Sequence, residues 1–514
     1  MNPLRVVVLS LVMGSTVPSQ TAITPQPIAE WGPGLSTRLE LLSTTCHSGW
    51  SVPIDVDGDG DIDAVQFGSR DRSGLLTVTF NDGGGRFTSR IFPPAWAQTW
   101  HSSYYIGVGD IDGDGDPDIV VPASWLNSTR IGTDRPWVHL NDGRGNFVLD
   151  NTRFPLSPRI RVNCVLVDVD RDGDLDAVFA GGTSGAYAGQ VEVWLNDGHG
   201  YFTDASAALV PVGTGANYVE AGDLDGDGLP DLVLASYSDT STEPKRILWN
   251  DGAAGFSLQR LFPMNTIEAV HVFDADGDGD LDILFSGGLK FLYRNDGNRL
   301  LTQIPFPSNN QLYAYGPVSI GDIDADGDQD VVIAGTIFKP FVLLNDGRAS
   351  FTEAPGWIHG TWQQGIYRFA FADVDGDGDQ DAYAQPIPFI TAFNGAVFYN
   401  LHRQVWGLPT VARGGTYLVE VTGRPQTTFA LAAHGAILIN PLSLGPLGTW
   451  WLDAGTLVAL PPVRCDVLGA ATLSIPIPNV PSLAGKTLVL QGMDLGTSAP
   501  RLVHATGYWS VRIL

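Results

Sequence analysis

The sequence predicts an all-β protein, with a seven-bladed β-propeller followed by a small C-terminal β-sandwich. An aspartate-rich motif of nine residues recurs seven times along the 514-residue chain. A second motif, Asn-Asp-Gly, follows it in most of the units. Both motifs stop near residue 405, where short apolar segments between Gly and Pro take over.

The aspartate motif has the pattern D-x-D-x-D-G-x-x-D and first occurs as DVDGDGDID at residues 55–63. Its seven copies begin at Asp55, Asp110, Asp168, Asp223, Asp274, Asp322 and Asp373. The first and last copies lie 318 residues apart over six intervals, a mean period of 53 residues. A regular period of this size indicates a repeat architecture.

Asn-Asp-Gly turns begin at Asn81, Asn141, Asn196, Asn250, Asn295 and Asn345, and the seventh unit keeps only Asn400. Asp-Gly between apolar segments favours a β-hairpin, because a type I′ turn needs positive φ at both central residues. The surrounding segments are rich in Val, Ile and aromatic residues and lack helical periodicity. Each unit is therefore predicted to contain four strands, which is the composition of a propeller blade.

The predicted propeller extends from residue 31 to residue 403. One strand more than the repeat requires precedes the first aspartate motif, at about residues 36–44. The seventh unit, in turn, lacks a clear fourth strand after Asn400. We therefore expect the N-terminal segment to supply the outer strand of the last blade and to close the ring.

The aspartate motif is the predicted metal site. Ionised carboxylates about 4 Å apart repel by about 4 kcal/mol at an effective dielectric constant near 20, so a crowded loop needs a cation. Oxygen ligands in this number suit Ca²⁺. Positions 1, 3, 5 and 9 are Asp in every copy, and position 6 is Gly, which allows a sharp turn. Position 7 is expected to bind through its backbone carbonyl, because it is Leu229 in the fourth copy and Asp in the others.

The predicted calcium ligands follow the motif through all seven loops. They are Asp55, Asp57, Asp59, Asp61 and Asp63; Asp110, Asp112, Asp114, Asp116 and Asp118; Asp168, Asp170, Asp172, Asp174 and Asp176; Asp223, Asp225, Asp227, Leu229 and Asp231; Asp274, Asp276, Asp278, Asp280 and Asp282; Asp322, Asp324, Asp326, Asp328 and Asp330; and Asp373, Asp375, Asp377, Asp379 and Asp381. An EF-hand does not fit, because position 12 is never Glu. Thrombospondin-like modules repeat far more closely than every 53 residues.

The charge agrees with about seven structural Ca²⁺ ions. The invariant positions supply 28 of the 56 acidic residues, four from each of seven loops. Seven Ca²⁺ ions, with 14 positive charges, would change the formal net charge from −27 to −13. Each ion is expected to fix the hairpin between the first two strands of a blade. Folding is therefore expected to depend on calcium.

At these residues the chain resembles the FG-GAP/VCBS repeat family, whose best-known member is the propeller of integrin alpha subunits. The resemblance spans about 370 residues and implies a seven-bladed propeller with calcium in the hairpin between the first two strands of a blade. The chain has no inserted adhesion domain, no D-x-S-x-S motif and no membrane anchor, so integrin receptor function is not implied. Exported bacterial repeat proteins, fungal lectins and some polysaccharide lyases look similar at this level.

The two ends of the chain differ from the repeat. Residues 1–19 have Arg5 before an apolar run and small residues before Gln20, which predicts a secretory signal peptide. Residues 405–514 contain short apolar segments between Gly and Pro turns, which predicts the β-sandwich module. Three cysteines at Cys46, Cys164 and Cys465 are too few for a disulfide framework.

The predicted function is an exported calcium-binding scaffold, secreted or at the cell surface, for protein or glycan binding and adhesion. The acidic surface, with a pI near 4.4, argues against nucleic acid as a partner. No span of the membrane is expected after signal removal, and we expect a monomer without enzymatic activity.

Two alternatives are a carbohydrate-binding lectin and an extracellular enzyme such as a polysaccharide lyase. The lectin would use aromatic loops on the face opposite the calcium hairpins, whereas the enzyme would need a basic cluster at the channel mouth. The candidate ligand-binding residues are Trp96, Trp100, His101, Trp125, Trp357, His359 and Trp362.

Overall fold

The computed structural model describes residues 35–513 except for a series of loops. Outside the description are residues 1–34, 42–48, 69–74, 93–104, 123–134, 182–190, 237–244, 262–266, 308–316, 335–339, 355–365, 375–378, 387–395, 423–427, 444–448, 453–457, 466–469 and 495–503, together with gaps of one to three residues and Leu514. The predicted signal peptide, residues 1–19, thus lies outside the described residues.

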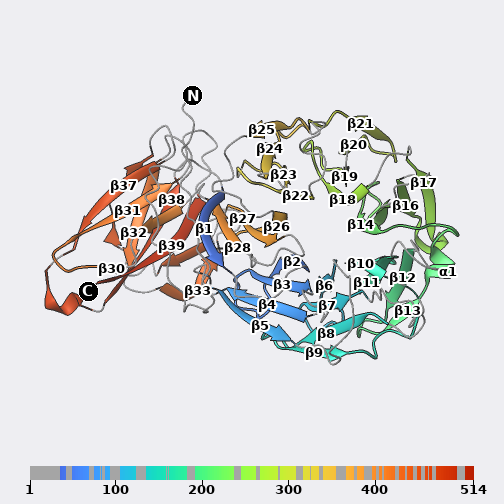
Figure 1. Cartoon of the computed structure of the whole chain (residues 1–514), viewed down its shortest axis with the longest axis horizontal. Helices are drawn as coiled ribbons and strands as arrows, with labels where there is room; N and C mark the ends of the chain where they lie inside the picture. The colour runs from blue at the N-terminus through green and yellow to red at the C-terminus, as the bar shows by residue number, and fades with distance from the viewer. Residues whose placement is uncertain are drawn as a thin grey trace, which may run out of the picture.

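Six four-stranded sheets are each built from four consecutive strands and are called blades one to six (Figure 1). Their strands are β2 (Gly49–Ile54), β3 (Asp63–Gly68), β4 (Leu75–Asn81) and β5 (Phe87–Phe92); β6 (Gly107–Gly109), β7 (Asp118–Val121), β8 (Trp137–Asn141) and β9 (Phe147–Asp150); β10 (Arg161–Val167), β11 (Asp176–Gly181), β12 (Val191–Asn196) and β13 (Phe202–Asp204); β14 (Tyr218–Gly222), β15 (Asp231–Ala235), β16 (Arg246–Asn250) and β17 (Phe256–Arg260); β18 (Ile267–Phe273), β19 (Asp282–Gly287), β20 (Phe291–Asn295) and β21 (Leu301–Ile304); β22 (Val318–Gly321), β23 (Asp330–Ile333), β24 (Phe341–Leu344) and β25 (Thr352–Ala354). Neighbouring strands in each blade are antiparallel.

A seventh four-stranded sheet is composite. It has the order β1-β28-β27-β26, with β1 (Leu35–Leu41) from the N-terminus beside β28 (Ala396–Asn400), then β27 (Asp381–Pro386) and β26 (Ile366–Ala372). β26 contacts β22 of blade six, and both β26 and β27 contact β2 of blade one. Figure 1 shows the blue β1 beside the orange β27 and β28.

The prediction of an all-β propeller is confirmed, with few helices in the described residues. Within those residues, the sheets made only of consecutive strands number six rather than the expected seven. The reason is that the last unit obtains its outer strand from β1, some 355 residues earlier in the chain, instead of from its own sequence.

Buried apolar side chains lie between neighbouring blades. Val65 and Val78 of blade one, for example, belong to one buried cluster with Ile119 and Val121 of blade two. The strands are rich in β-branched residues, whose stiff side chains fit a pleated surface. Burying these side chains face to face supplies the main stabilisation of the ring.

The C-terminal residues form three further sheets. A three-stranded sheet has the order β29 (Gln404–Gly407), β31 (Thr416–Thr422) and β37 (Ala470–Pro476). A larger sheet has the order β30 (Thr410–Val411), β39 (His504–Ile513), β38 (Thr487–Asp494), β32 (Thr428–His434) and β35 (Val458–Ala459), with β36 (Val463–Arg464) also on β32. β33 (Ile437–Ser443) pairs with β34 (Thr449–Leu452). Val419 of β31 and Leu490 of β38 share one buried cluster, so the first two sheets have a common core.

Helices are short in this chain. α1 (Ser206–Leu209) and the 3₁₀ turns η2 (Gly252–Ala254) and η6 (Pro481–Leu483) have three or four residues each. In the part of the chain that the structure describes, no helix has the length and apolar character needed to cross a membrane.

Candidate metal centre and central channel

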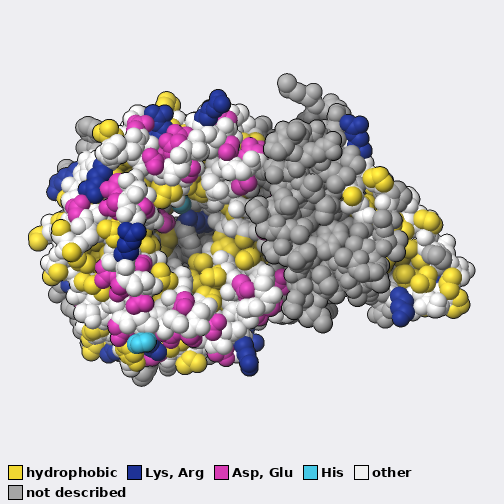
Figure 2. Space-filling view, turned by 180° about the vertical axis from the view of Figure 1, so that it is seen from behind, with side chains coloured by type: hydrophobic (Ala, Val, Ile, Leu, Met, Phe, Trp, Pro, Cys, Tyr) yellow, Lys and Arg dark blue, Asp and Glu magenta, His cyan; other side chains and the backbone are white. Residues whose placement is uncertain are grey.

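The aspartate loops occupy the same connection in every unit, between the first and second strands of a sheet. All of them therefore lie at one end of the propeller. Figure 2 shows acidic side chains spaced around a hollowed centre on the face in view. The last residue of each loop is the first residue of the second strand, for example Asp63 in β3.

The aspartate at position 9 is completely buried in every loop. The seven residues, each with zero exposure, are Asp63, Asp118, Asp176, Asp231, Asp282, Asp330 and Asp381. The carboxylate of Asp63 accepts a hydrogen bond from the backbone N–H of Val56 at 3.0 Å and another from that of Asn81 at 2.8 Å. The equivalent pair of bonds occurs in the other six loops, so each of these carboxylates has a fixed position.

The aspartates at positions 1 and 5 shape the loop itself. Asp55 accepts the backbone N–H groups of Gly58 and Gly60, and Asp59 accepts that of Asp61. The glycine at position 6 has φ between 87° and 102° in the six loops where it is described, which is the left-handed region that favours glycine. The invariant glycine of the motif is thereby explained.

Carboxylates at positions 1, 3 and 9 converge. In at least five loops one oxygen from each lies within 4.8 Å of the others, and these groups are Asp55, Asp57 and Asp63; Asp110, Asp112 and Asp118; Asp168, Asp170 and Asp176; Asp223, Asp225 and Asp231; and Asp274, Asp276 and Asp282. At position 3, the Oδ1 atoms of Asp57, Asp112 and Asp276 are buried and accept no hydrogen bond. Each such buried oxygen is destabilising unless another group satisfies it.

Burial and mutual repulsion favour protonation of these carboxyl groups. Burial raises the pKa of Asp282 to about 6 and that of five other position-9 aspartates to about 7, although two backbone hydrogen bonds oppose each shift; the five are Asp63, Asp118, Asp176, Asp231 and Asp330. The pKa of Asp57 is raised by burial and then by the charges of Asp59 and Asp55. A divalent cation among these oxygens would remove the repulsion.

The side chain at position 7 faces the Asn-Asp-Gly turn of the same blade. A side chain added at Gly143 or Gly198 would clash with the carboxylate of Asp116 or Asp174, respectively. In blade four, Leu229 lies in the same place, and its Cδ1 would be 3.6 Å from a side chain at Gly252. In the seventh loop, Asp375 and Asp377 lie outside the described residues.

The asparagine that ends the third strand has a role that the sequence analysis missed. The Nδ2 of Asn141 donates to the backbone carbonyl of Val56 in the preceding blade at 2.8 Å. Equivalent bonds of 2.6–2.8 Å run from Asn196, Asn250, Asn295, Asn345 and Asn400 to the blade before each. Asn81 of blade one donates to Val374 of the composite sheet at 2.7 Å, which completes the circle. The sequence did contain one signal of this role: the seventh unit keeps Asn400 although it has lost the Asp-Gly turn.

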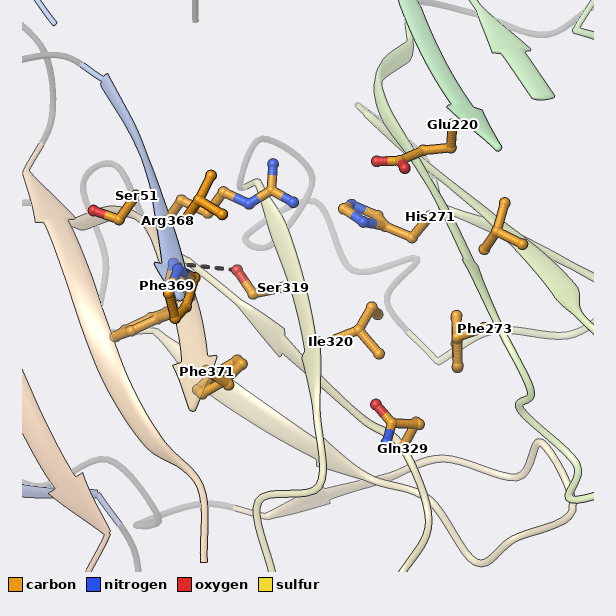
Figure 3. Close-up of a pocket in the computed structure, with 14 residues that line it drawn as sticks. Ser51, Glu220, His271, Phe273, Ser319, Ile320, Gln329, Arg368, Phe369 and Phe371 are labelled. Atoms are coloured by element: carbon orange, nitrogen blue, oxygen red, sulfur yellow. Dashed lines mark hydrogen bonds between the residues drawn. The ribbon is translucent and has the colours of Figure 1, made fainter. Parts of the chain in front are cut away.

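A polar cluster in the central channel was also missed. Glu220, His271 and Arg368 come from β14, β18 and β26, and Figure 3 shows them directed toward the same space. Burial raises the pKa of Glu220 to about 7, although the charge of Arg368 opposes the shift. Burial and then the charge of Arg368 lower the pKa of His271 well below its usual value.

The aromatic residues predicted to bind a ligand lie outside the described residues. They are Trp96, Trp100, His101, Trp125, Trp357, His359 and Trp362.

Similarity to known proteins is clearest in the repeat. Residues 55–121, 168–234, 223–285 and 322–384 match the FG-GAP-like repeat family. No curated protein sequence matches the chain.

Several solved structures align with this chain at low sequence identity and with TM-scores below 0.5. A fungal alcohol oxidase in complex with copper is 11% identical, with 93% of this chain and 99% of that chain covered and a TM-score of 0.47. YCF48 bound to D1 peptide is 13% identical, with coverages of 72% and 97% and a TM-score of 0.44. An exo-β-1,3-galactanase from Phanerochaete chrysosporium is 11% identical, with coverages of 81% and 98% and a TM-score of 0.29. The repeat match and the sheets agree: this chain carries FG-GAP-like repeats at four positions, within a propeller arrangement of four-stranded sheets.

Proposed function

We propose that this chain is an exported calcium-binding propeller scaffold that presents surfaces to extracellular protein or glycan partners. Each aspartate loop binds one structural Ca²⁺, about seven in all. The composite sheet acts as the seventh blade and closes the ring, and the C-terminal sheets form a β-sandwich module. The signal peptide at residues 1–19 directs export.

The observation that best supports calcium is the convergence of three carboxylates in at least five of these loops. In three loops, one oxygen of the position-3 carboxylate is buried and accepts no hydrogen bond. Ca²⁺ takes six to eight oxygen ligands and tolerates irregular geometry. The residues at positions 1, 3, 5 and 9 offer carboxylates, and position 7 offers its backbone carbonyl. A bound ion would satisfy the oxygens of Asp57, Asp112 and Asp276 and offset the repulsion within each loop.

Metal counting on the purified chain tests this proposal. The chain is treated with EGTA, dialysed against about 1 mM Ca²⁺ or Mg²⁺, and analysed for bound metal. We expect close to seven Ca²⁺ and few Mg²⁺, because Mg²⁺ demands regular octahedral geometry and dehydrates reluctantly. Asp57→Asn should lose about one ion, and the exposed Glu353→Gln should lose none. A wild-type chain without bound Ca²⁺ would refute the proposal.

Binding is proposed over catalysis. The enzyme alternative needs a convergent basic cluster, whereas Arg368 is the only Lys or Arg among the described residues that line the channel cavity. The lectin alternative remains a prediction from the aromatic loops.

A further inference from the structure

A cavity of about 350 Å³ lies at the centre of the propeller. Five inner strands, β2, β14, β18, β22 and β26, contribute its wall. Its volume is in the range of small-molecule sites. The hollow in Figure 2 shows basic and histidine side chains inside it.

The polar side chains of this cavity are confined to part of the ring. Glu220, His271 and Ser319 each stand three residues before the first aspartate of their loop, in blades four, five and six. The same position in blades one to three is Val52, Gly107 or Val165. The repeat alone therefore does not require a polar residue here, and the polar side chains mark one side of the channel.

Two side chains on this polar side, His271 and Ser319, offer hydrogen-bonding atoms to the cavity. His271 is 7% exposed, and its Nε2 atom is buried without a hydrogen-bond partner. The Oγ atom of Ser319 accepts a hydrogen bond from the backbone N–H of Phe369 at 3.1 Å, which leaves the hydroxyl hydrogen to donate. Buried polar groups of this kind are normally paired, so a ligand that pairs with them would be stabilised.

The opposite part of the cavity is apolar except for Gln329. Figure 3 shows Phe273, Ile320 and Phe371 below the polar cluster, on the side toward the aspartate loops. The guanidinium of Arg368 extends into the polar part, and its charge acts on both Glu220 and His271. The site thus combines one permanent positive charge, a set of hydrogen-bonding groups and a mostly apolar floor.

We propose that this cavity binds a small hydroxy acid with an apolar body. Arg368 binds the carboxylate, His271 and Ser319 bind the hydroxyl group, and the body packs against Phe273 and Phe371. Guanidinium and carboxylate form the strong charge-assisted hydrogen bonds that such a ligand needs in a buried site. This site is separate from the calcium loops, so its test is made on the calcium-loaded chain and is independent of the metal count.

Calorimetric titration with three related probes tests the proposal. Mandelate carries a ring, a hydroxyl and a carboxylate; phenylacetate lacks the hydroxyl; and mandelamide lacks the charge. We expect mandelate to bind about tenfold more tightly than mandelamide and several-fold more tightly than phenylacetate. Equal binding of all three, or no binding of mandelate at about 10 mM, overturns the proposal.

Substitutions of single lining residues test which side chains bind mandelate. Arg368→Gln should weaken mandelate binding about tenfold, whereas the exposed Arg144→Gln should leave it unchanged. Since Arg368→Gln could affect folding, Glu220→Gln gives a second test that keeps the side-chain shape. It removes the one acidic group among the described lining residues and should tighten mandelate binding about threefold. Weaker binding to Glu220→Gln would contradict the assigned position of the carboxylate.

Discussion

At the scale of single residues, the aspartates at positions 9 and 3 of the loop differ in how they contribute to stability. Asp63 is held by two backbone hydrogen bonds, so its carboxylate is in place before a cation binds. Asp57 has a buried oxygen that accepts no hydrogen bond and has like charges beside it. Asp63 therefore supports the fold directly, whereas we propose that Asp57 stabilises the chain through a bound ion.

The two positions predict opposite effects of an Asp→Asn change in EGTA. Asp63→Asn should lower the free energy of unfolding by about 1–3 kcal/mol with or without Ca²⁺, because an amide NH₂ would face a backbone N–H. Asp57→Asn should be neutral or stabilising in EGTA and destabilising only in Ca²⁺. Urea unfolding of both variants measures this. Equal losses in both conditions would show that the loops do not act through a cation.

The asparagine ring gives a matched pair of changes within one turn. Asn295 is completely buried and donates to the carbonyl of Leu224 at 2.6 Å, whereas Asn298 is exposed. Asn295→Asp replaces a donor by an acceptor and should cost about 1–3 kcal/mol of stability, while Asn298→Asp should cost little. Thermal unfolding in Ca²⁺ compares them. Similar unfolding midpoints for the two variants would show that the asparagine hydrogen bonds do not stabilise the contact between blades.

The buried aspartates also predict how pH acts on the metal-free chain. Their pKa in the folded state is raised to about 7 from 3.8, so the folded chain binds more protons than the unfolded chain in this window. In EGTA the free energy of unfolding should therefore fall as the pH rises from about 4 to about 7. Two buried histidines oppose this trend: burial lowers the pKa of His139 to about 4 and the pKa of His271 well below its usual value. Calcium should remove the trend, and a rise of stability with pH in EGTA would contradict it.

At the scale of elements, β1 is the part of the sheet arrangement most distant in sequence from its partner. Its Leu39 and Leu41 stand opposite Phe398 and Ala396 of β28. Without β1, the composite sheet would end in an unpaired edge. A chain lacking residues 1–41 should therefore unfold at a lower temperature than one lacking residues 1–34, measured in the same Ca²⁺ buffer. Equal midpoints would show that β1 does not stabilise the ring.

The period of 53 residues was sufficient to place the sheets, because each unit repeats the same order of apolar segments and turns. The loop glycine and the burial of position 9 also follow the motif. The inter-blade bonds of residues such as Asn141 were not predictable, since a turn asparagine and an asparagine between blades look alike in one sequence. Glu220 and His271 were missed because their position is apolar or small in the first three blades.

At the scale of the whole molecule, seven crowded acidic loops lie at one end of the ring, in a chain whose formal net charge is −27. Repulsion among them opposes the compact state unless cations are bound. The buried apolar clusters between blades and the circle of asparagine hydrogen bonds oppose this repulsion, because they join each blade to the next. We therefore propose that calcium is part of the folded structure and not a ligand of a scaffold that folds without it.

Thermal unfolding of the purified chain in excess EGTA and in millimolar Ca²⁺ tests this central claim most directly. A site filled at 100 times its dissociation constant contributes about 2.7 kcal/mol, so several sites together should raise the midpoint by a large amount. We predict that rise in Ca²⁺ and a much smaller one in Mg²⁺. The same midpoint in EGTA and in Ca²⁺ would contradict the account.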